Sequence, residues 1–150
     1  MKAVVESVTT APPEVAYATN IDIANRPAFI RGITHVAILS GGAIDTGTRF
    51  RETRTMFGRE ATEEMTVAVL EPPRRQIFTA ENHGVRYVAT TEFLPEGHGA
   101  RLRLTFEGVP LTMTARIMSI VSMLLISKVK KQLQNDLDDV AAEAAKRAGR

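Results

Sequence analysis

The stretch RLRLTFE at residues 101–107 alternates strictly between polar and apolar side chains. Leu102, Leu104 and Phe106 form the apolar set, and charged or hydroxylated residues form the other. A period of two is typical of a β-strand that is buried on one face and exposed on the other. Five strand-like segments between residues 50 and 106 follow this pattern. The sequence therefore predicts an antiparallel sheet with a distinct inner and outer face.

Composition indicates a globular protein with one domain, residues 1–150. Its apolar fraction of 44% is ordinary, and its formal net charge of +2 is dispersed, so no nucleic-acid partner is expected. The lack of cysteine and of a hydrophobic signal core near Met1 favours a cytoplasmic protein. The longest uncharged apolar run, residues 117–127, is too short for a transmembrane segment.

The N-terminal residues predict one strand, two short helices and a second strand. Residues 2–9 alternate like a strand, and two prolines followed by Glu14 favour the start of a helix. A second short helix is expected between Asn25 and Gly32. Residues 34–40 then predict the second strand, which precedes a glycine-rich turn.

Tight turns between the remaining strands predict how these strands pair. We expect two-residue turns at residues 58–59 and 83–84, and four-residue turns at residues 71–74 and 95–98. With these turns, the apolar sets of all five strands fall on one face. The predicted opposite pairs are Met56 and Ala61, Arg54 and Glu63, Glu52 and Met65, Phe50 and Val67, Val69 and Gln76, Val67 and Phe78, Met65 and Ala80, Asn82 and Val85, Ala80 and Tyr87, Phe78 and Ala89, Phe93 and Ala100, Thr91 and Leu102, Ala89 and Leu104, and Tyr87 and Phe106.

The inner face needs a cover, and residues 111–147 are the only large apolar element left. The second half of this segment has apolar residues at helical spacing, namely Ile126, Val129, Leu133, Leu137, Val140 and Ala144. The first half is apolar nearly all round, so we expect it to be buried on more than one side. The predicted fold is α+β: a seven-stranded curved antiparallel sheet wrapped around a long C-terminal helix, with two short helices after the first strand.

This order of elements is that of the helix-grip fold, and the chain resembles the START-like (SRPBCC) superfamily. That superfamily includes the polyketide cyclase/dehydrase and lipid-transport family and the major birch pollen allergen. The resemblance is carried by residues 11–15, 22–29, 47–50, 70–74 and 99–102. It implies a hydrophobic cavity between sheet and helix. Members bind lipids, polyketides, sterols or ubiquinone-like molecules, and some catalyse cyclisation or dehydration.

The resemblance also implies which residues line a ligand pocket between the inner sheet face and the first half of the long helix. The candidate ligand-binding residues are Phe29 near the mouth, Phe50, Met65, Val67, Phe78, Asn82, Tyr87, Thr91, Leu104 and Phe106 on the sheet, and Met113, Ile117, Met118, Val121 and Leu125 on the helix. Each apolar member also fits ordinary core packing, because apolar residues at these periods are usually core.

Polar residues interrupt the predicted inner face at Glu52, Arg54, Glu63, Gln76 and Asn82. The predicted register brings all of these except Gln76 together at one end of the cavity, where Arg54 would pair with the two carboxylates. As candidate catalytic residues, Glu52 or Glu63 would be a general acid or base and Arg54 would hold a carbonyl or carboxylate group. The alternative is a structural ion-pair patch at the edge of the sheet.

These observations leave three functional hypotheses. The first is binding or transport of a small hydrophobic ligand, such as a lipid, a polyketide or a quinone-like molecule. The second is a polyketide cyclase or dehydratase that uses the Glu/Arg cluster, and the third is an interaction module without a ligand. No metal and no cofactor are expected, because no two of the three histidines have metal-ligand spacing. Lys128, Lys130 and Lys131 could support a transient membrane contact, although a solvated helix face is the commoner explanation of such a group.

Overall fold

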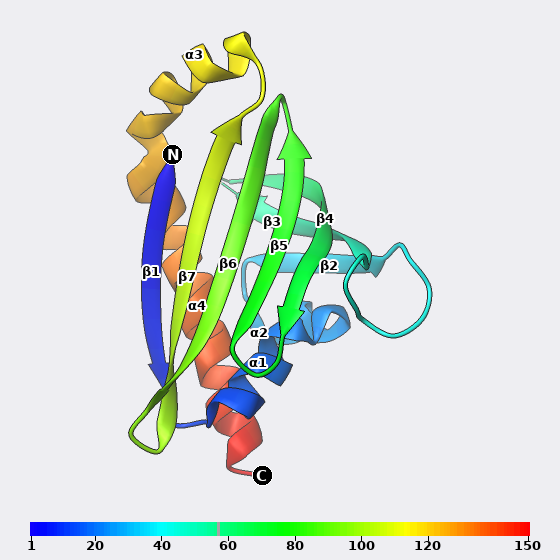
Figure 1. Cartoon of the computed structure of the whole chain (residues 1–150), viewed down its shortest axis with the longest axis vertical. Helices are drawn as coiled ribbons and strands as arrows, with labels where there is room; N and C mark the ends of the chain where they lie inside the picture. The colour runs from blue at the N-terminus through cyan, green and yellow to red at the C-terminus, as the bar shows by residue number, and fades with distance from the viewer. Residues whose placement is uncertain (57) are drawn as a thin grey trace.

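In the computed structural model of the chain, a curved antiparallel sheet packs against the C-terminal helix (Figure 1). Residues 1–56 and 58–150 are described, except for the side chains of residues 121 and 122. The described residues form seven strands in the order β1-β7-β6-β5-β4-β3-β2. The elements are β1 (Lys2–Thr9), α1 (Pro13–Ile21), the 3₁₀ helix η1 (Ile23–Asn25), α2 (Arg26–Phe29), β2 (Ile33–Ile38), β3 (Arg49–Met56), β4 (Arg59–Glu71), β5 (Arg75–Asn82), β6 (Val85–Glu96), β7 (Gly99–Pro110), α3 (Met113–Ser122), the 3₁₀ helix η2 (Met123–Leu125) and α4 (Ile126–Ala148). The predicted helix-grip fold is confirmed.

The β6–β7 hairpin is tighter than predicted. Its turn consists of residues 97–98, and Gly97 has a φ of 57°, a left-handed conformation that suits a two-residue turn. Phe93 therefore lies opposite Leu102 instead of Ala100. The partners of Thr91, Ala89 and Tyr87 are likewise Leu104, Phe106 and Gly108. Because the shift is two residues, each side chain keeps its predicted face.

The β3–β4 hairpin is also shifted by two residues, because Met56 pairs with Arg59 and not with Ala61. Glu52 consequently lies opposite Glu63 and not opposite Met65. The same shift places Arg54 opposite Ala61 and Phe50 opposite Met65. The predicted pairing of Arg54 with Glu63 across the two strands is therefore wrong, although both residues stay on the predicted face.

The two remaining hairpins agree better with the prediction. β5 and β6 pair as expected, with Asn82 opposite Val85. β4 and β5 place Val67 opposite Phe78 as expected, but a bulge follows in β4. Leu70, and not Val69, then lies opposite Gln76. A bulge inserts one extra residue and so changes the partner beyond it.

Helix α4 covers one part of the inner face. Figure 1 shows α4 behind β1 and β7, with α1 and α2 near its C-terminal end. The predicted apolar line of α4 is confirmed where Leu137, Val140 and Ala144 are buried. They pack in one core cluster with Phe93 and Leu102 of the sheet. A second cluster consists of Ile23, Phe50, Val67 and Phe78.

The first half of the C-terminal segment does not follow the prediction. The 3₁₀ helix η2 separates α3 from α4, so the segment is not one continuous helix. Met113 is 70% exposed and Ile117 is 62% exposed, so the expected burial on more than one side is wrong. The small residue Ala115 of α3 is buried instead. Figure 1 shows α3 at the end of the sheet opposite to α1 and α2.

Gly99, at the start of β7, offers a test of the arrangement of β1 and β7. A Cβ atom at Gly99 would collide with the carbonyl oxygen of Thr9, which belongs to the backbone and has little freedom to move. We expect Gly99→Ala to destabilise the protein by about 1–3 kcal/mol, the usual range for overpacking. Urea denaturation followed by circular dichroism measures this loss.

The matched control for this substitution is Gly41→Ala in the loop after β2. A Cβ atom at Gly41 meets nothing within 4 Å. This variant should change the free energy of unfolding by less than about 0.5 kcal/mol. Equal stability of the two variants would contradict the close approach of Thr9 to β7.

Candidate functional site

Four charged side chains form a buried ion-pair network that joins α2, β3 and α4. Arg54 Nη2 lies 3.0 Å from Glu52 Oε1 and 2.8 Å from Asp136 Oδ2. Arg26 Nε lies 3.4 Å from Glu52 Oε2. The Glu52 side chain is only 5% exposed. Two positive and two negative charges therefore balance one another in a largely water-free environment.

Burial and charge act on this network in opposite directions. Burial raises the pKa of the Asp136 carboxyl group, while Arg54 and, more weakly, Arg26 lower it in part. Burial alone would lower the pKa of Arg54, but Asp136 and Glu52 outweigh burial and hold that pKa above its ordinary value. Arg54 therefore stays charged, and its guanidinium group is the centre of the network.

A chain of hydrogen bonds extends this network toward α1. Arg26 Nη1 donates to the Asn20 carbonyl oxygen at 2.9 Å and to Asn20 Oδ1 at 3.2 Å. Asn20 Nδ2 donates to Gln76 Oε1 at 2.7 Å, and Gln76 Nε2 donates to the Tyr17 carbonyl oxygen at 2.9 Å. The guanidinium group of Arg26 also lies 6.0 Å from the centre of the Phe78 ring. Gln76, one of the predicted polar exceptions, thus connects β5 to α1.

Glu63 and Asn82 form a separate pair, so the predicted single cluster is divided in two. Asn82 Nδ2 donates to Glu63 Oε1 at 3.5 Å, and Asn82 is exposed. The pairing of Arg54 with Glu52 is confirmed. The second carboxylate partner of Arg54 is Asp136 of α4, and not Glu63 as predicted. The two-residue shift between β3 and β4 explains this difference, because it places Ala61 opposite Arg54 and Glu63 opposite Glu52.

Arg26 and Asp136 are the members of the network that sequence reasoning missed. Asp136 lies three residues after Leu133 and four before Val140, so helical periodicity places it on the apolar, sheet-facing side of α4. A carboxylate inside an apolar helical stripe is a signal for a buried partner of opposite charge. Arg26 gives no comparable signal, because its short helix has no clear periodicity.

The predicted ligand-binding residues on the sheet divide into two groups. Phe50, Val67, Phe78 and Thr91 are buried. Met65, Tyr87, Leu104 and Phe106 are only half-buried, as are Ala80 and Ala89. We call the inner face at these six half-buried side chains the open end. Ala80, Tyr87, Ala89 and Phe106 lie toward the β5–β6 turn, whereas Leu104 and Met65 border the two core clusters.

Two aromatic rings mark the open end. Tyr87 and Phe106 stack with ring centroids 5.5 Å apart and an interplanar angle of 18°. Gly108 lies opposite Tyr87, and a Cβ atom there would lie 3.3 Å from the tyrosine ring, so glycine leaves room for it. Burial, and then the charge of Glu63, raises the pKa of Tyr87. Its hydroxyl group therefore stays protonated and can donate a hydrogen bond.

The other predicted ligand-binding residues do not join the wall of the open end. Phe29 is half-buried, and the guanidinium group of Arg147 lies 5.3 Å from the centre of its ring, near the C-terminal end of α4. Its predicted place at the mouth of a pocket beside the first half of the helix is therefore wrong. The helix residues Met113, Ile117, Met118 and Leu125 are exposed. The side chain of Val121 lies outside the described part of the chain.

An open cleft of about 520 Å³ lies between α4 and the neighbouring β2–β3 edge. The residues that line it are Arg31, Gly32, Thr55, Lys128, Lys131, Gln132, Asn135, Asp136 and Asp139. Asp136 thus connects the buried network to this cleft. Along the described residues, no three histidine, aspartate or glutamate side chains are grouped as a metal site. The described helices also include none that is long and apolar enough to cross a membrane.

The sheet, its covering helix and the partly uncovered inner face define a helix-grip protein. The chain belongs to the polyketide cyclase/dehydrase and lipid transport family, whose model matches residues 1–145. A comparison with curated proteins found no match.

Solved structures with low sequence identity share the fold. The ZhuI aromatase/cyclase from Streptomyces sp. R1128 superimposes with a TM-score of 0.78 at 18% identity, covering 98% of this chain and 94% of that one. The protein TTHA0849 from Thermus thermophilus gives a TM-score of 0.72 at 21% identity, with 99% and 97% covered. Ara h 8.0201 gives 0.71 at 14% identity, with 97% and 98% covered. At these identities the likeness establishes the fold alone.

The buried ion-pair network can be tested by removing its centre. Arg54→Ala leaves the carboxylates of Glu52 and Asp136 buried without the guanidinium group that they share. We expect a loss of about 3–5 kcal/mol in the free energy of unfolding, because an uncompensated buried charge is strongly destabilising. The control is Arg49→Ala on the outer face, where the exposed pair with Glu64 should contribute about 0–1 kcal/mol. Losses of equal size in the two variants would contradict a buried network.

Proposed function

We propose that the protein binds and carries a small apolar ligand, such as a lipid, a polyketide or a quinone-like molecule, at the open end of the inner sheet face. The observation that carries this proposal is the half-burial of Met65, Tyr87, Leu104 and Phe106 on the concave side of the sheet. Phe93 and Leu102, which pack with α4, are by contrast almost fully buried. Family membership supports the same kind of ligand.

The physical chemistry of the open end favours a ligand with a small polar group. The Tyr87–Phe106 stack offers a flat apolar surface, and Met65 adds a flexible side chain that adapts to different shapes. Polar groups lie close by, because the Glu63 carboxylate acts on Tyr87 and contacts Asn82. Ligand sites commonly combine a large apolar wall with a few polar groups that fix orientation.

The proposal predicts that filling the open end blocks binding. Ala89 lies opposite Phe78 on one side and Phe106 on the other, so Ala89→Trp places a large ring among the wall residues. We expect the affinity for a dansyl-labelled fatty acid to fall by about tenfold or more, which corresponds to about 1.4 kcal/mol. Fluorescence titration measures the affinity, and native mass spectrometry of the purified protein identifies any molecule that copurifies.

Thr90→Trp is the matched control. Thr90 follows Ala89 in β6, so its side chain points to the outer face of the sheet. This variant should bind the fatty acid as the unchanged protein does. Equal binding by the Ala89→Trp and unchanged proteins would place the ligand elsewhere. A protein that binds no fatty acid and copurifies with nothing would contradict the carrier function and favour an interaction module.

A second candidate function is that of a polyketide cyclase or dehydratase. It is favoured by one observation: a half-buried carboxylate, Glu63, lies close enough to Tyr87 for its charge to raise the pKa of the tyrosine beside the apolar wall. Glu63 would act as a general base toward an enolisable ketone, and Tyr87 would donate a hydrogen bond to the carbonyl oxygen. Glu52 is less accessible for such a role, because two arginines pair with it.

Glu63→Gln separates the enzyme from the carrier. If the protein is an enzyme, this variant should lose about 100-fold or more in the rate of conversion of a linear poly-β-ketone, the usual contribution of a general base. Mass spectrometry of the product measures the rate, and fatty-acid binding should persist. Glu64→Gln on the exposed outer face is the control and should keep the full rate. No conversion by the unchanged protein would leave the carrier function alone.

A further inference from the structure

Helix α3 presents its large apolar side chains away from the protein. Ala115 is 4% exposed and Ser119 is half-buried, so a stripe of small residues faces the protein. The opposite side of the helix has apolar residues at positions separated by four, three and four residues. These are Met113 (70% exposed), Ile117 (62%) and Ile120 (67%) of α3, together with Leu124 (82%) of the adjoining η2. We call these four side chains the outward face of α3.

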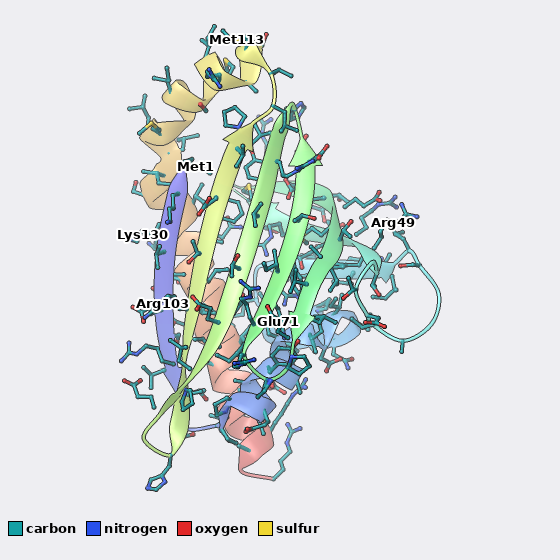
Figure 2. All side chains as sticks on the ribbon, in the orientation of Figure 1. Met1, Arg49, Glu71, Arg103, Met113 and Lys130 are labelled. Carbon is teal, nitrogen blue, oxygen red and sulfur yellow. The ribbon has the colours of Figure 1, made fainter. Side chains whose placement is uncertain are left out.

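This orientation is the reverse of what water favours for a helix. A surface helix ordinarily turns its apolar stripe to the core and its polar stripe to solvent. Figure 2 shows Met113 at the outer tip of α3, beyond the end of the sheet. Large contiguous apolar patches on a protein surface mark contact with another apolar phase or molecule. The outward face therefore needs an occupant other than water.

The segment that carries the outward face has only positive charges. Residues 108–135 contain no aspartate or glutamate, and they include Arg116, Lys128, Lys130 and Lys131. In Figure 2, Lys130 lies on α4 along the same side of the molecule. The nearest acidic residues in the sequence are Glu107 and Asp136, one on each side of the segment. A negatively charged partner surface is therefore attracted over the whole segment.

We propose that α3 docks on a membrane surface that contains anionic lipids, with its outward face buried at the boundary between headgroups and acyl chains. Apolar side chains together with nearby lysine and arginine residues are the features that hold a helix in that boundary. Each lysine or arginine near an anionic surface adds to the attraction, which acts over roughly the Debye length. Arg116, Lys130 and Lys131 would meet the headgroups while the outward face enters the apolar layer.

A second copy of the chain fits the outward face less well. A contact between two outward faces would bring together two segments that carry four positive charges each and no negative ones. Like charges that face one another oppose association, and they favour an anionic partner instead. The proposal is independent of the carrier function, because a docked protein need not carry any ligand. If both hold, cargo would leave and enter the open end near the membrane.

Flotation of the full chain with lipid vesicles tests the docking. We expect binding to vesicles of phosphatidylcholine and phosphatidylglycerol, and at least about tenfold weaker binding to phosphatidylcholine alone. The double variant Ile117→Ser/Ile120→Ser should lower the affinity for the anionic vesicles by about tenfold or more. Lys130→Glu/Lys131→Glu should lower it severalfold, and added salt should do the same.

Val8→Ser is the matched control, because Val8 on β1 is 57% exposed but lies outside α3. It should bind vesicles as the unchanged protein does. Thermal unfolding by circular dichroism verifies that each variant is folded. Fatty-acid binding is measured in parallel, so that failure of the docking and failure of the carrier function give different results.

Three results would overturn the proposal. The first is the absence of binding to anionic vesicles. The second is binding that Ile117→Ser/Ile120→Ser does not weaken relative to Val8→Ser. The third is a dimer, detected by analytical ultracentrifugation, that the same double substitution dissociates while vesicle binding is absent. That last result would assign the outward face to a second copy of the chain.

Discussion

Arg54 joins two carboxylates that come from different layers of the protein, Glu52 on strand β3 and Asp136 on helix α4. Buried charges are tolerated only when they are paired, so these elements must keep a fixed spacing. Arg26 pairs with the same Glu52 and adds helix α2 to the arrangement. The apolar contacts of Leu137 and its neighbours with the sheet depend on the same placement of α4. One end of the inner face is thereby closed with both apolar and ionic contacts.

The open end of the inner face is left uncovered because α4 does not extend over it. The buried contacts of α4 lie between residues 137 and 144, and η2 interrupts the helix before it reaches the open end. Helix α3 does not replace this cover, because its apolar side chains point outward. The half-buried wall around Tyr87 and the outward face of α3 are thus two consequences of the same break in the C-terminal segment. Both leave apolar surface available to molecules other than this chain.

The fold could be predicted from the sequence because the alternation of polar and apolar residues stays informative even when the hairpin register is predicted wrongly. Moving a hairpin by two residues changes every cross-strand partner, yet Leu102 and Glu63 keep their faces because side chains alternate with a period of two. Turn length was the weak point, since two-residue and four-residue turns are both compatible with the alternation at residues 95–98. Face assignment is therefore more secure than partner assignment.

The candidate site was harder to predict, for two physical reasons. Arg26 and Asp136 meet Glu52 and Arg54 only through tertiary packing, which no local pattern specifies. The apolar residues of α3 show that this helix needs an apolar environment, but a sequence does not say which molecule supplies it. Apolar residues of a helix are ordinarily buried inside their own chain. Ile117 and its neighbours in α3 are instead exposed.

The division of the polar residues also separates their roles in any chemistry. A general base must reach a proton of the substrate and must exchange that proton without breaking contacts that hold the fold. Glu52 meets neither condition, because Arg54 and Arg26 engage its oxygens and the loss of its charge would leave both guanidinium groups short of a partner. Glu63 is half-buried beside Tyr87, and its hydrogen bond to Asn82 is long and exposed. Reactivity toward a ligand is therefore compatible with the fold at Glu63, whereas at Glu52 it would compete with the contacts that place α4.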